Sequence, residues 1–171
     1  MIFRLSQKLN AKIKAGTLGA QALDENPFAD WSAHVFSAKH TQYVIICNTR
    51  SFYSTVMYAK GITNENLFIT RVLGGLREFL EDDGQEFIYT HLISPASATV
   101  RFAKALDRSV TGSMNDLIYH ATMCLIEDEM APHDVGFKLN KIPFSSLTYT
   151  NPRETLKSMA ATVVPDPTRM T

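Results

Sequence analysis

The sequence has no excess of charge of either sign. Its 171 residues include 17 Lys and Arg and 17 Asp and Glu, which gives a formal net charge of zero. Proteins that bind nucleic acid usually carry a basic excess, because neutralising phosphates supplies most of their non-specific affinity. The balance therefore disfavours nucleic acid as a partner. It also removes self-repulsion, which leaves homo-oligomer formation open.

Cysteines and long apolar runs are scarce. The two cysteines, Cys47 and Cys124, form no CxxC pair and are too few for a disulfide framework, so we expect buried free thiols. No apolar run approaches the ~20 residues of a membrane helix. The first residues lack the apolar segment of a signal peptide. These absences predict a cytoplasmic protein with no membrane partner.

Motifs for nucleotides, metals and acyl transfer are also missing. There is no GxxxxGK[ST] loop, no GxSxG turn and no HExxH pair. Asp116, His120, Cys124 and Glu127 have metal-ligand side chains at helical spacing, but a polar helix face with one thiol is the more common cause of this pattern. The sequence therefore predicts no metal site and no cofactor.

Apolar patterns predict a single α+β domain over residues 1–160, followed by a flexible tail over residues 161–171. Period-two or continuously apolar runs predict a three-stranded antiparallel meander over residues 31–36, 43–47 and 51–58. Residues 2–5 and 99–104 add one or two more strands to this mostly antiparallel central sheet. We expect helices to pack on the sheet.

Helical spacing indicates where these helices lie. The longest is expected over residues 64–83 and is capped by Thr63 or Asn64. Gly74 and Gly75 in its middle each cost about 1 kcal/mol relative to Ala, and close packing against the sheet is the simplest reason for them, with a functional kink as the alternative. The remaining helices are expected over residues 6–15, 87–93, 113–129, 132–140 and 151–159.

The polar stretch over residues 107–116 is the strongest candidate for a site. We expect a loop after a strand, with Ser113 capping the next helix and Asp116 in a capping-box position. Such a helix end can hold an anion, and the Arg108 side chain can clamp a phosphate or carboxylate. The alternative is that Asp107 and Arg108 pair locally and the other residues only cap the helix.

A second set of candidates is drawn from the strand over residues 31–36. His34 is a candidate acid or base, although a strand histidine is more often packed or exposed. Asp107 and Asp116 complete the catalytic candidates. The ligand-binding candidates are Trp31, Arg108, Ser109, Ser113 and Asn115.

Four segments carry a resemblance to a known family. They are LSQKL at residues 5–9, NPFADWSAHVF at 26–36, NTRS at 48–51 and DRSVTGSMNDL at 107–117. The chain resembles a bacterial domain family of unknown function over about residues 1–160. This resemblance implies a single domain and brings no activity, cofactor or catalytic residue with it.

Three hypotheses follow. The first is a small binding or interaction module whose anionic small molecule or protein partner meets residues 107–116 and the strand from Trp31 to His34. The second is a small hydrolase or transferase in which His34 acts as base, Arg108 and the helix end at Ser113 stabilise an anionic transition state, and Asp107 or Asp116 orients the groups. The third is a nucleic-acid-associated protein of a mobile element or defence system. The first two depend on whether the strand with His34 faces residues 107–116, whereas the third requires a contiguous positive patch on the surface.

Overall fold

The computed structural model describes residues 1–164 of the chain. Five strands form one sheet in the order β4-β3-β2-β1-β5. Their bounds are β1 (Ile2–Leu5), β2 (Asp30–Ala38), β3 (Thr41–Asn48), β4 (Ser54–Tyr58) and β5 (Arg101–Ala103). Strands β2, β3 and β4 pair antiparallel, whereas β1 pairs parallel with both β2 and β5. The α+β class and the meander are confirmed, and the two added strands make the sheet mixed.

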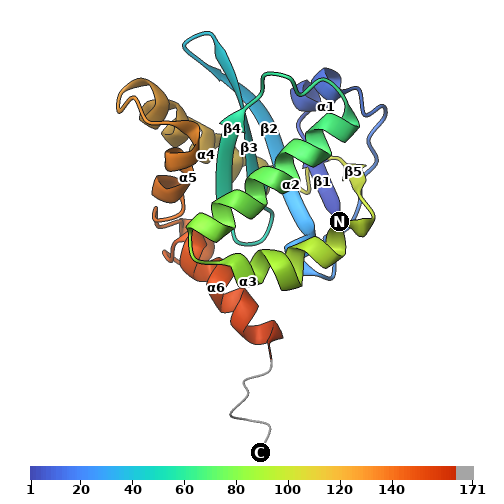
Figure 1. Ribbon diagram of the computed structural model, residues 1–171, viewed down its shortest axis with the longest axis vertical. Helices are drawn as coiled ribbons and strands as arrows, with labels where there is room; N and C mark the ends of the chain where they lie inside the picture. The colour runs from blue at the N-terminus through green and yellow to red at the C-terminus, as the bar shows by residue number, and fades with distance from the viewer. Residues whose placement is uncertain (165–171) are drawn as a thin grey trace, which may run out of the picture.

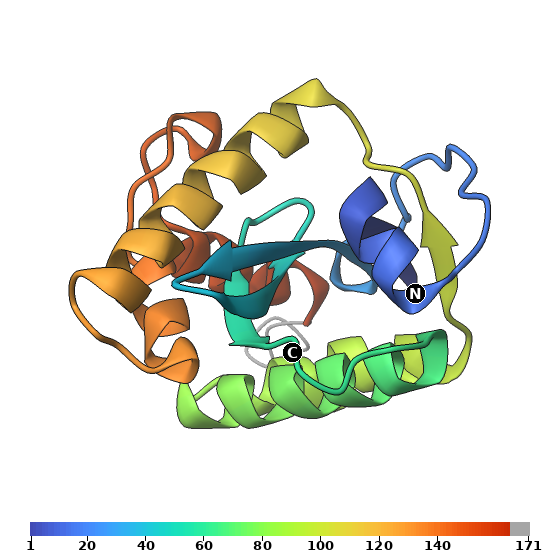
Figure 2. The same cartoon turned by 90° about the horizontal axis from the view of Figure 1, so that it is seen from above.

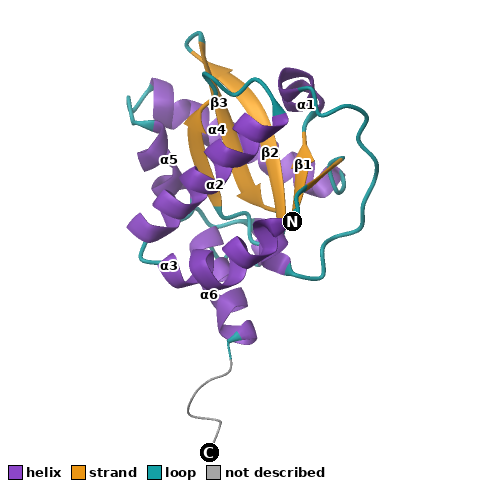
Figure 3. Ribbon diagram, turned by 45° about the vertical axis from the view of Figure 1, so that its right-hand side comes forward, coloured by secondary structure: helices purple, strands orange, loops and turns teal. Residues whose placement is uncertain are grey.

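Helices cover both faces of this sheet (Figures 1 and 2). They are α1 (Gln7–Ile13), α2 (Glu65–Asp82), α3 (Glu86–Ile88), α4 (Arg108–Ile126), α5 (Pro132–Leu139) and α6 (Pro152–Val163). Buried residues of α1, α2 and α6 join one core cluster, and those of α4 and α5 join a second cluster across the sheet. Figure 3 shows the strands enclosed between these helices.

Helix α2 forms as its sequence pattern predicts. The Asn64 side chain accepts a hydrogen bond from the backbone amide of Leu67 and so caps the helix. The expected apolar stripe is fully buried against the sheet: Phe68, Val72, Leu76, Phe79 and Leu80. Burial of this stripe, at roughly 25 cal/mol per Å² of apolar surface, makes α2 a principal layer of the core.

Two strands are shorter than expected. The third strand of the meander begins at Ser54 rather than at residue 51, because Phe52 takes a left-handed backbone conformation with φ of 59°. The Asn48 side chain holds this wide turn by accepting hydrogen bonds from the Ser51 amide and hydroxyl. The strand expected over residues 99–104 is the three-residue edge strand β5.

The end of the chain is only partly described. Helix α6 continues to Val163, past the predicted end at residue 159 and into the predicted tail, and its Leu156 and Ala160 are buried in the core. Residues 165–171 of the predicted tail lie outside the described residues.

Candidate functional site

The parallel part of the sheet contains a topological switch point. After β1 the chain enters α1, whose Leu9 and Ile13 join the core cluster on the α2 side of the sheet. After the neighbouring β5 it enters α4, whose Val110 and Met114 join the cluster on the opposite side. Where connections from adjacent parallel strands diverge to opposite faces, a crevice opens beyond the carboxyl ends of the strands. Such crevices are the usual ligand sites of open α/β sheets.

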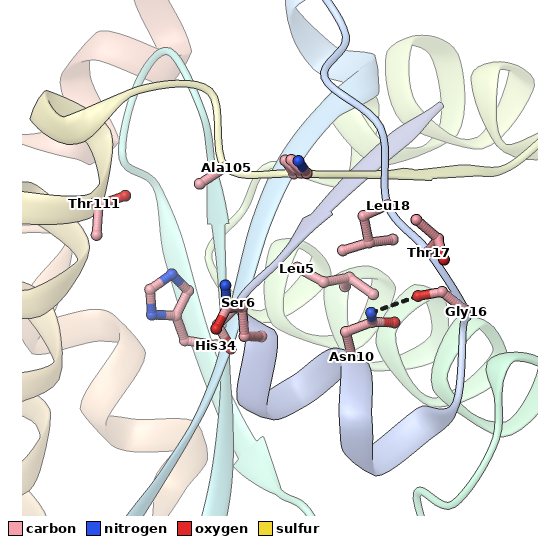
Figure 4. Close-up of a pocket in the computed structure, with 11 residues that line it drawn as sticks. Leu5, Ser6, Asn10, Gly16, Thr17, Leu18, His34, Ala105 and Thr111 are labelled. Carbon is pink, nitrogen blue, oxygen red and sulfur yellow. Dashed lines mark hydrogen bonds between the residues drawn. The ribbon is translucent and has the colours of Figure 1, made fainter.

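A cavity of about 620 Å³ lies at this switch point. Its volume is within the range of small-molecule sites. Figure 4 shows His34 and Thr111 on one side of it and Asn10, Thr17 and Leu18 on the other. The lining residues come from β1 and α1, the loop after α1, β2, and the segment that joins β5 to α4: Leu5, Ser6, Gln7, Asn10, Gly16, Thr17, Leu18, His34, Lys104, Ala105 and Thr111.

His34 extends from the middle of β2 into this cavity. Its side chain is half-buried, and desolvation by burial lowers its pKa below the usual 6.5. Among the described residues, no group makes a hydrogen bond to the ring. His34 is therefore a neutral imidazole at neutral pH, with one nitrogen able to donate and the other able to accept.

Asn10, which also lines this cavity, has a side-chain oxygen without a hydrogen-bond partner among the residues that the structure describes. Its Nδ2 donates to the Gly16 carbonyl oxygen at 2.7 Å, which ties α1 to the following loop. Its Oδ1 is buried and accepts no hydrogen bond from any described residue, and no other buried side-chain atom in the described part of the chain shares this condition. Buried polar atoms are normally satisfied, so this oxygen is suited to a donor from outside the chain.

The charge of the lining is one-sided. Lys104 is its only ionised residue, and no Asp or Glu lines the cavity. Leu5, Leu18 and Ala105 supply an apolar wall. The lining therefore combines a cation, a neutral imidazole, an unsatisfied amide oxygen and an apolar surface.

The stretch over residues 107–116 is helical, not the loop that was expected. Helix α4 begins at Arg108, and Asp107 is its N-cap residue with Oδ1 accepting from the Val110 amide at 2.8 Å. The prediction that Ser113 caps this helix, with Asp116 in a capping box, was wrong. Aspartate caps a helix as well as serine does, and Val110 already belongs to the buried stripe that continues with Met114. The capping residue Asp107 and the apolar spacing of Val110 with Met114 were both visible in the sequence.

Because α4 begins at Arg108, most of the predicted site residues lie away from the cavity. Asn115 and Asp116 are exposed at the end of the second turn of α4 and the start of the third, and Arg108 and Ser109 are exposed in the first. Neither they nor Ser113 lines the cavity, to which α4 contributes only Thr111. His34 does face the start of α4, but it meets Thr111 there rather than the predicted partners.

Trp31 lies on the other side of the sheet. Its side chain is fully buried in the cluster beneath α2, and its Nε1 donates to the Phe28 carbonyl oxygen at 2.8 Å. Side chains three apart on a strand point to opposite faces, so Trp31 and His34 cannot meet one ligand on the same face. The structure places Trp31 in the core rather than at the cavity.

The metal-ligand side chains on the α4 face with Cys124 do not share one environment. Cys124 is buried in the cluster beneath α4, where burial raises the pKa of its thiol, whereas His120 is exposed with its ring beside Tyr119. Cys47 is fully buried, and burial raises its pKa to about 12. Both thiols are free and remain protonated at neutral pH.

Sequence reasoning missed Asn10 and Lys104. They stand on segments about 90 residues apart, and neither belongs to a motif with recognisable spacing. The only available signal was that Lys104 is the last residue of the strand expected over residues 99–104 and that Asn10 follows shortly after the strand over residues 2–5, which places both near the carboxyl ends of strands. Because the parallel pairing of β1 with β5 was not anticipated, that signal could not be used.

Comparison with known proteins identifies the family. The profile of a domain of unknown function, DUF6933, matches residues 2–155. The chain belongs to this family. Searches of curated proteins and of solved structures found no match. No helix in residues 1–164 has the length and apolar character needed to cross a membrane.

Proposed function

We propose that this DUF6933 protein is a small-molecule binding module whose ligand occupies the cavity at the carboxyl ends of β1 and β5. The observation that carries the proposal is a cavity at a topological switch point, one of whose lining residues, Asn10, has a side-chain oxygen without a hydrogen-bond partner among the described residues. A ligand that donates a hydrogen bond to this oxygen removes the cost of leaving it unpaired, which is about 1–3 kcal/mol.

The lining indicates the chemistry of the ligand. Lys104 favours an anionic group such as a carboxylate or phosphate, and no lining carboxylate opposes it. Neutral His34 accepts or donates one hydrogen bond, and Asn10 Oδ1 requires an N–H or O–H group. The ligand class is therefore a small organic anion that also carries a hydroxyl or amino group, with an apolar part against Leu5 and Leu18.

Ligand-observed NMR tests this proposal with matched probes. Nucleoside monophosphates, sugar phosphates, hydroxy acids and amino acids are each compared with a neutral counterpart. We expect an anionic member to bind, and protein-observed NMR with that ligand to show shifted amide signals for residues around His34. Lys104→Met weakens this binding about five-fold, the effect of losing roughly 1 kcal/mol of charge interaction. Asn10→Leu weakens it further because the donor on the ligand loses its acceptor.

Lys8→Met is the matched control, because Lys8 is an exposed lysine of α1 that does not line the cavity. The Lys8→Met variant is expected to bind the anionic probe with the affinity of the wild type. The proposal fails if no probe class binds, or if binding is the same in the wild type, Lys104→Met and Asn10→Leu.

The location proposed with this function is the cytoplasm of a bacterial cell. Its support is the pair of free, buried thiols, which suit a reducing compartment, together with the resemblance to a bacterial family. Fractionation of a native host tests the location, and recovery from the extracellular fraction contradicts it.

A further inference from the structure

Three metal-ligand side chains gather at a second cavity, at the β4 edge of the sheet, where α2 and α5 come together. We propose that Glu78 and Asp82 of α2, with His133 of α5, form a binding site for a divalent transition-metal ion such as Zn²⁺ or Co²⁺. Nothing in the sequence motifs indicated this site, because its ligands are brought together from two helices more than 50 residues apart.

The geometry is close to that of a three-ligand site. Glu78 and Asp82 are four residues apart and so share one face of α2. One ligand atom from each of the three residues lies within 4.8 Å of the others. His133 Nε2 is 2.8 Å from Asp82 Oδ2. Metal bonds of about 2.0–2.2 Å draw ligand atoms to roughly 3 Å apart, so small side-chain rotations complete the site.

Aromatic packing orients the imidazole of His133. The ring meets Phe79 and Phe137 edge to face, each with a centroid distance of 5.4 Å. Pro132 is buried and begins α5, which sets where His133 leaves the backbone. A histidine held in this way presents Nε2 to the carboxylates without losing further rotamer freedom when a metal binds.

The cavity beside the cluster provides room for open coordination positions. Its volume is about 670 Å³, and Glu78 and His133 both line it. Figure 1 shows α2 and α5 beside β4, the three elements that contribute most of its walls. A metal with three protein ligands keeps at least one position for water or another molecule, as in catalytic zinc sites.

The two mid-helix glycines of α2 differ in their packing. Of the two mid-helix glycines, Gly75 has a packing reason, because an added Cβ would lie 2.9 Å from Met57 Cε. An added Cβ on Gly74 meets no atom within 4 Å, yet Gly74 costs α2 about 1 kcal/mol relative to Ala. It lines the cavity one helical turn before Glu78. Close packing therefore explains Gly75, and no contact in the structure explains Gly74.

The donor set selects among metals. One imidazole nitrogen and two carboxylate oxygens suit Zn²⁺, Co²⁺ and Mn²⁺, whereas Ca²⁺ and Mg²⁺ prefer oxygen ligands alone. We therefore expect Zn²⁺ and Co²⁺ to bind more tightly than Mg²⁺ by at least ten-fold.

Isothermal titration of the full chain with Zn²⁺ and with Co²⁺ tests the site. The wild type takes up one ion, and NMR of the imidazole nitrogens shows the shift at His133. Glu78→Gln and His133→Ala each weaken binding at least ten-fold. His120→Ala and Glu81→Gln leave the affinity unchanged, because His120 is an exposed histidine on another helix and the Glu81 carboxylate pairs with Arg77.

Glu78→Gln is the decisive variant. Glu78 is exposed and makes no hydrogen bond with any described residue, so its replacement leaves the fold intact. His133→Ala also removes the bond to Asp82 and loosens α5, which thermal unfolding without metal reports. The inference is overturned if the wild type binds no more Zn²⁺ than Glu78→Gln does, or if its bound ion shifts the His120 ring and not that of His133.

Discussion

The two halves of the sheet are stabilised in different ways. The parallel half, β2-β1-β5, joins strands that are distant in sequence, while the antiparallel half, β2-β3-β4, joins consecutive strands. Short connections make the antiparallel half a local structure. The parallel half needs interactions that close long loops, and the structure supplies these as buried polar bonds.

Arg4 and Asp30 are the centre of the parallel half. The Arg4 guanidinium makes two 2.8 Å hydrogen bonds to the Asp30 carboxylate, and both side chains are buried. Arg4 also donates to the carbonyl oxygens of Gln21 and Ala22, which fixes the long loop after α1. Because this loop runs beside the first cavity, the ion pair supports the proposed ligand site as well as the sheet.

Close packing dominates the antiparallel half. An added Cβ on Gly136 of α5 would lie 2.6 Å from the Phe79 ring and 3.2 Å from the Ser54 carbonyl oxygen of β4. The Asn140 side chain at the end of α5 bonds both the amide and the carbonyl of Ser54. This half therefore depends on the fit of α5 between β4 and α2, and the comparison predicts different responses to substitution.

The largest expected effect is in the parallel half. Arg4→Met leaves Asp30 buried without its partner, and we expect a loss of about 3–5 kcal/mol in the free energy of unfolding. Urea denaturation followed by circular dichroism measures it. The exposed pair Arg77–Glu81 is the control, where Arg77→Met costs less than about 0.5 kcal/mol. A loss below 1 kcal/mol for Arg4→Met contradicts this account of the parallel half.

A smaller effect is expected at the contact between α5 and the antiparallel half. Gly136→Ala forces Phe79 or the β4 backbone to move, and overpacking of this kind costs about 1–3 kcal/mol. Gly112→Ala in α4 is the matched control, since its Cβ meets no atom within 4 Å and alanine favours the helix by about 1 kcal/mol. Chemical denaturation should show that the free energy of unfolding falls for Gly136→Ala and rises for Gly112→Ala. If both substitutions raise the free energy of unfolding, packing at Gly136 is looser than the distances imply.

The smallest effect at neutral pH concerns the protonation of Asp30. Burial alone raises its pKa, but the hydrogen bonds from Arg4 and the Asp24 amide outweigh burial and bring the pKa below its usual 3.8. A lowered folded-state pKa stabilises the protein above pH 3.8, and this stability is lost as the pH falls from there through the folded pKa. Stability curves should show this loss in the wild type and a shallower one in Asp30→Asn. If the wild type and Asp30→Asn lose the same stability as the pH falls, the hydrogen bonds to Asp30 do not outweigh its burial.

Much of the fold could be predicted from local patterns. The buried stripe of α2, its Asn64 cap and the meander follow from apolar spacing and from short turns, which act within a few residues. The start of α4 was misplaced because Asp107 and Ser113 are both good caps, and only the burial of Val110 separates them. The candidate site was predicted in part: His34 lies in the first cavity, and α4 contributes Thr111 to it instead of the polar residues that were expected.

The sequence by itself determined the α+β class, the strands of the meander, the positions of most helices and the balanced formal charge. Only the tertiary structure decided the parallel pairing of β1 with β5, which brings Asn10, His34 and Lys104 to one cavity. It also decided the meeting of His133 with Glu78 and Asp82. The physical reason is that helical and strand periodicity encode which face of an element is buried, whereas the partner of that face depends on contacts between residues far apart in the chain.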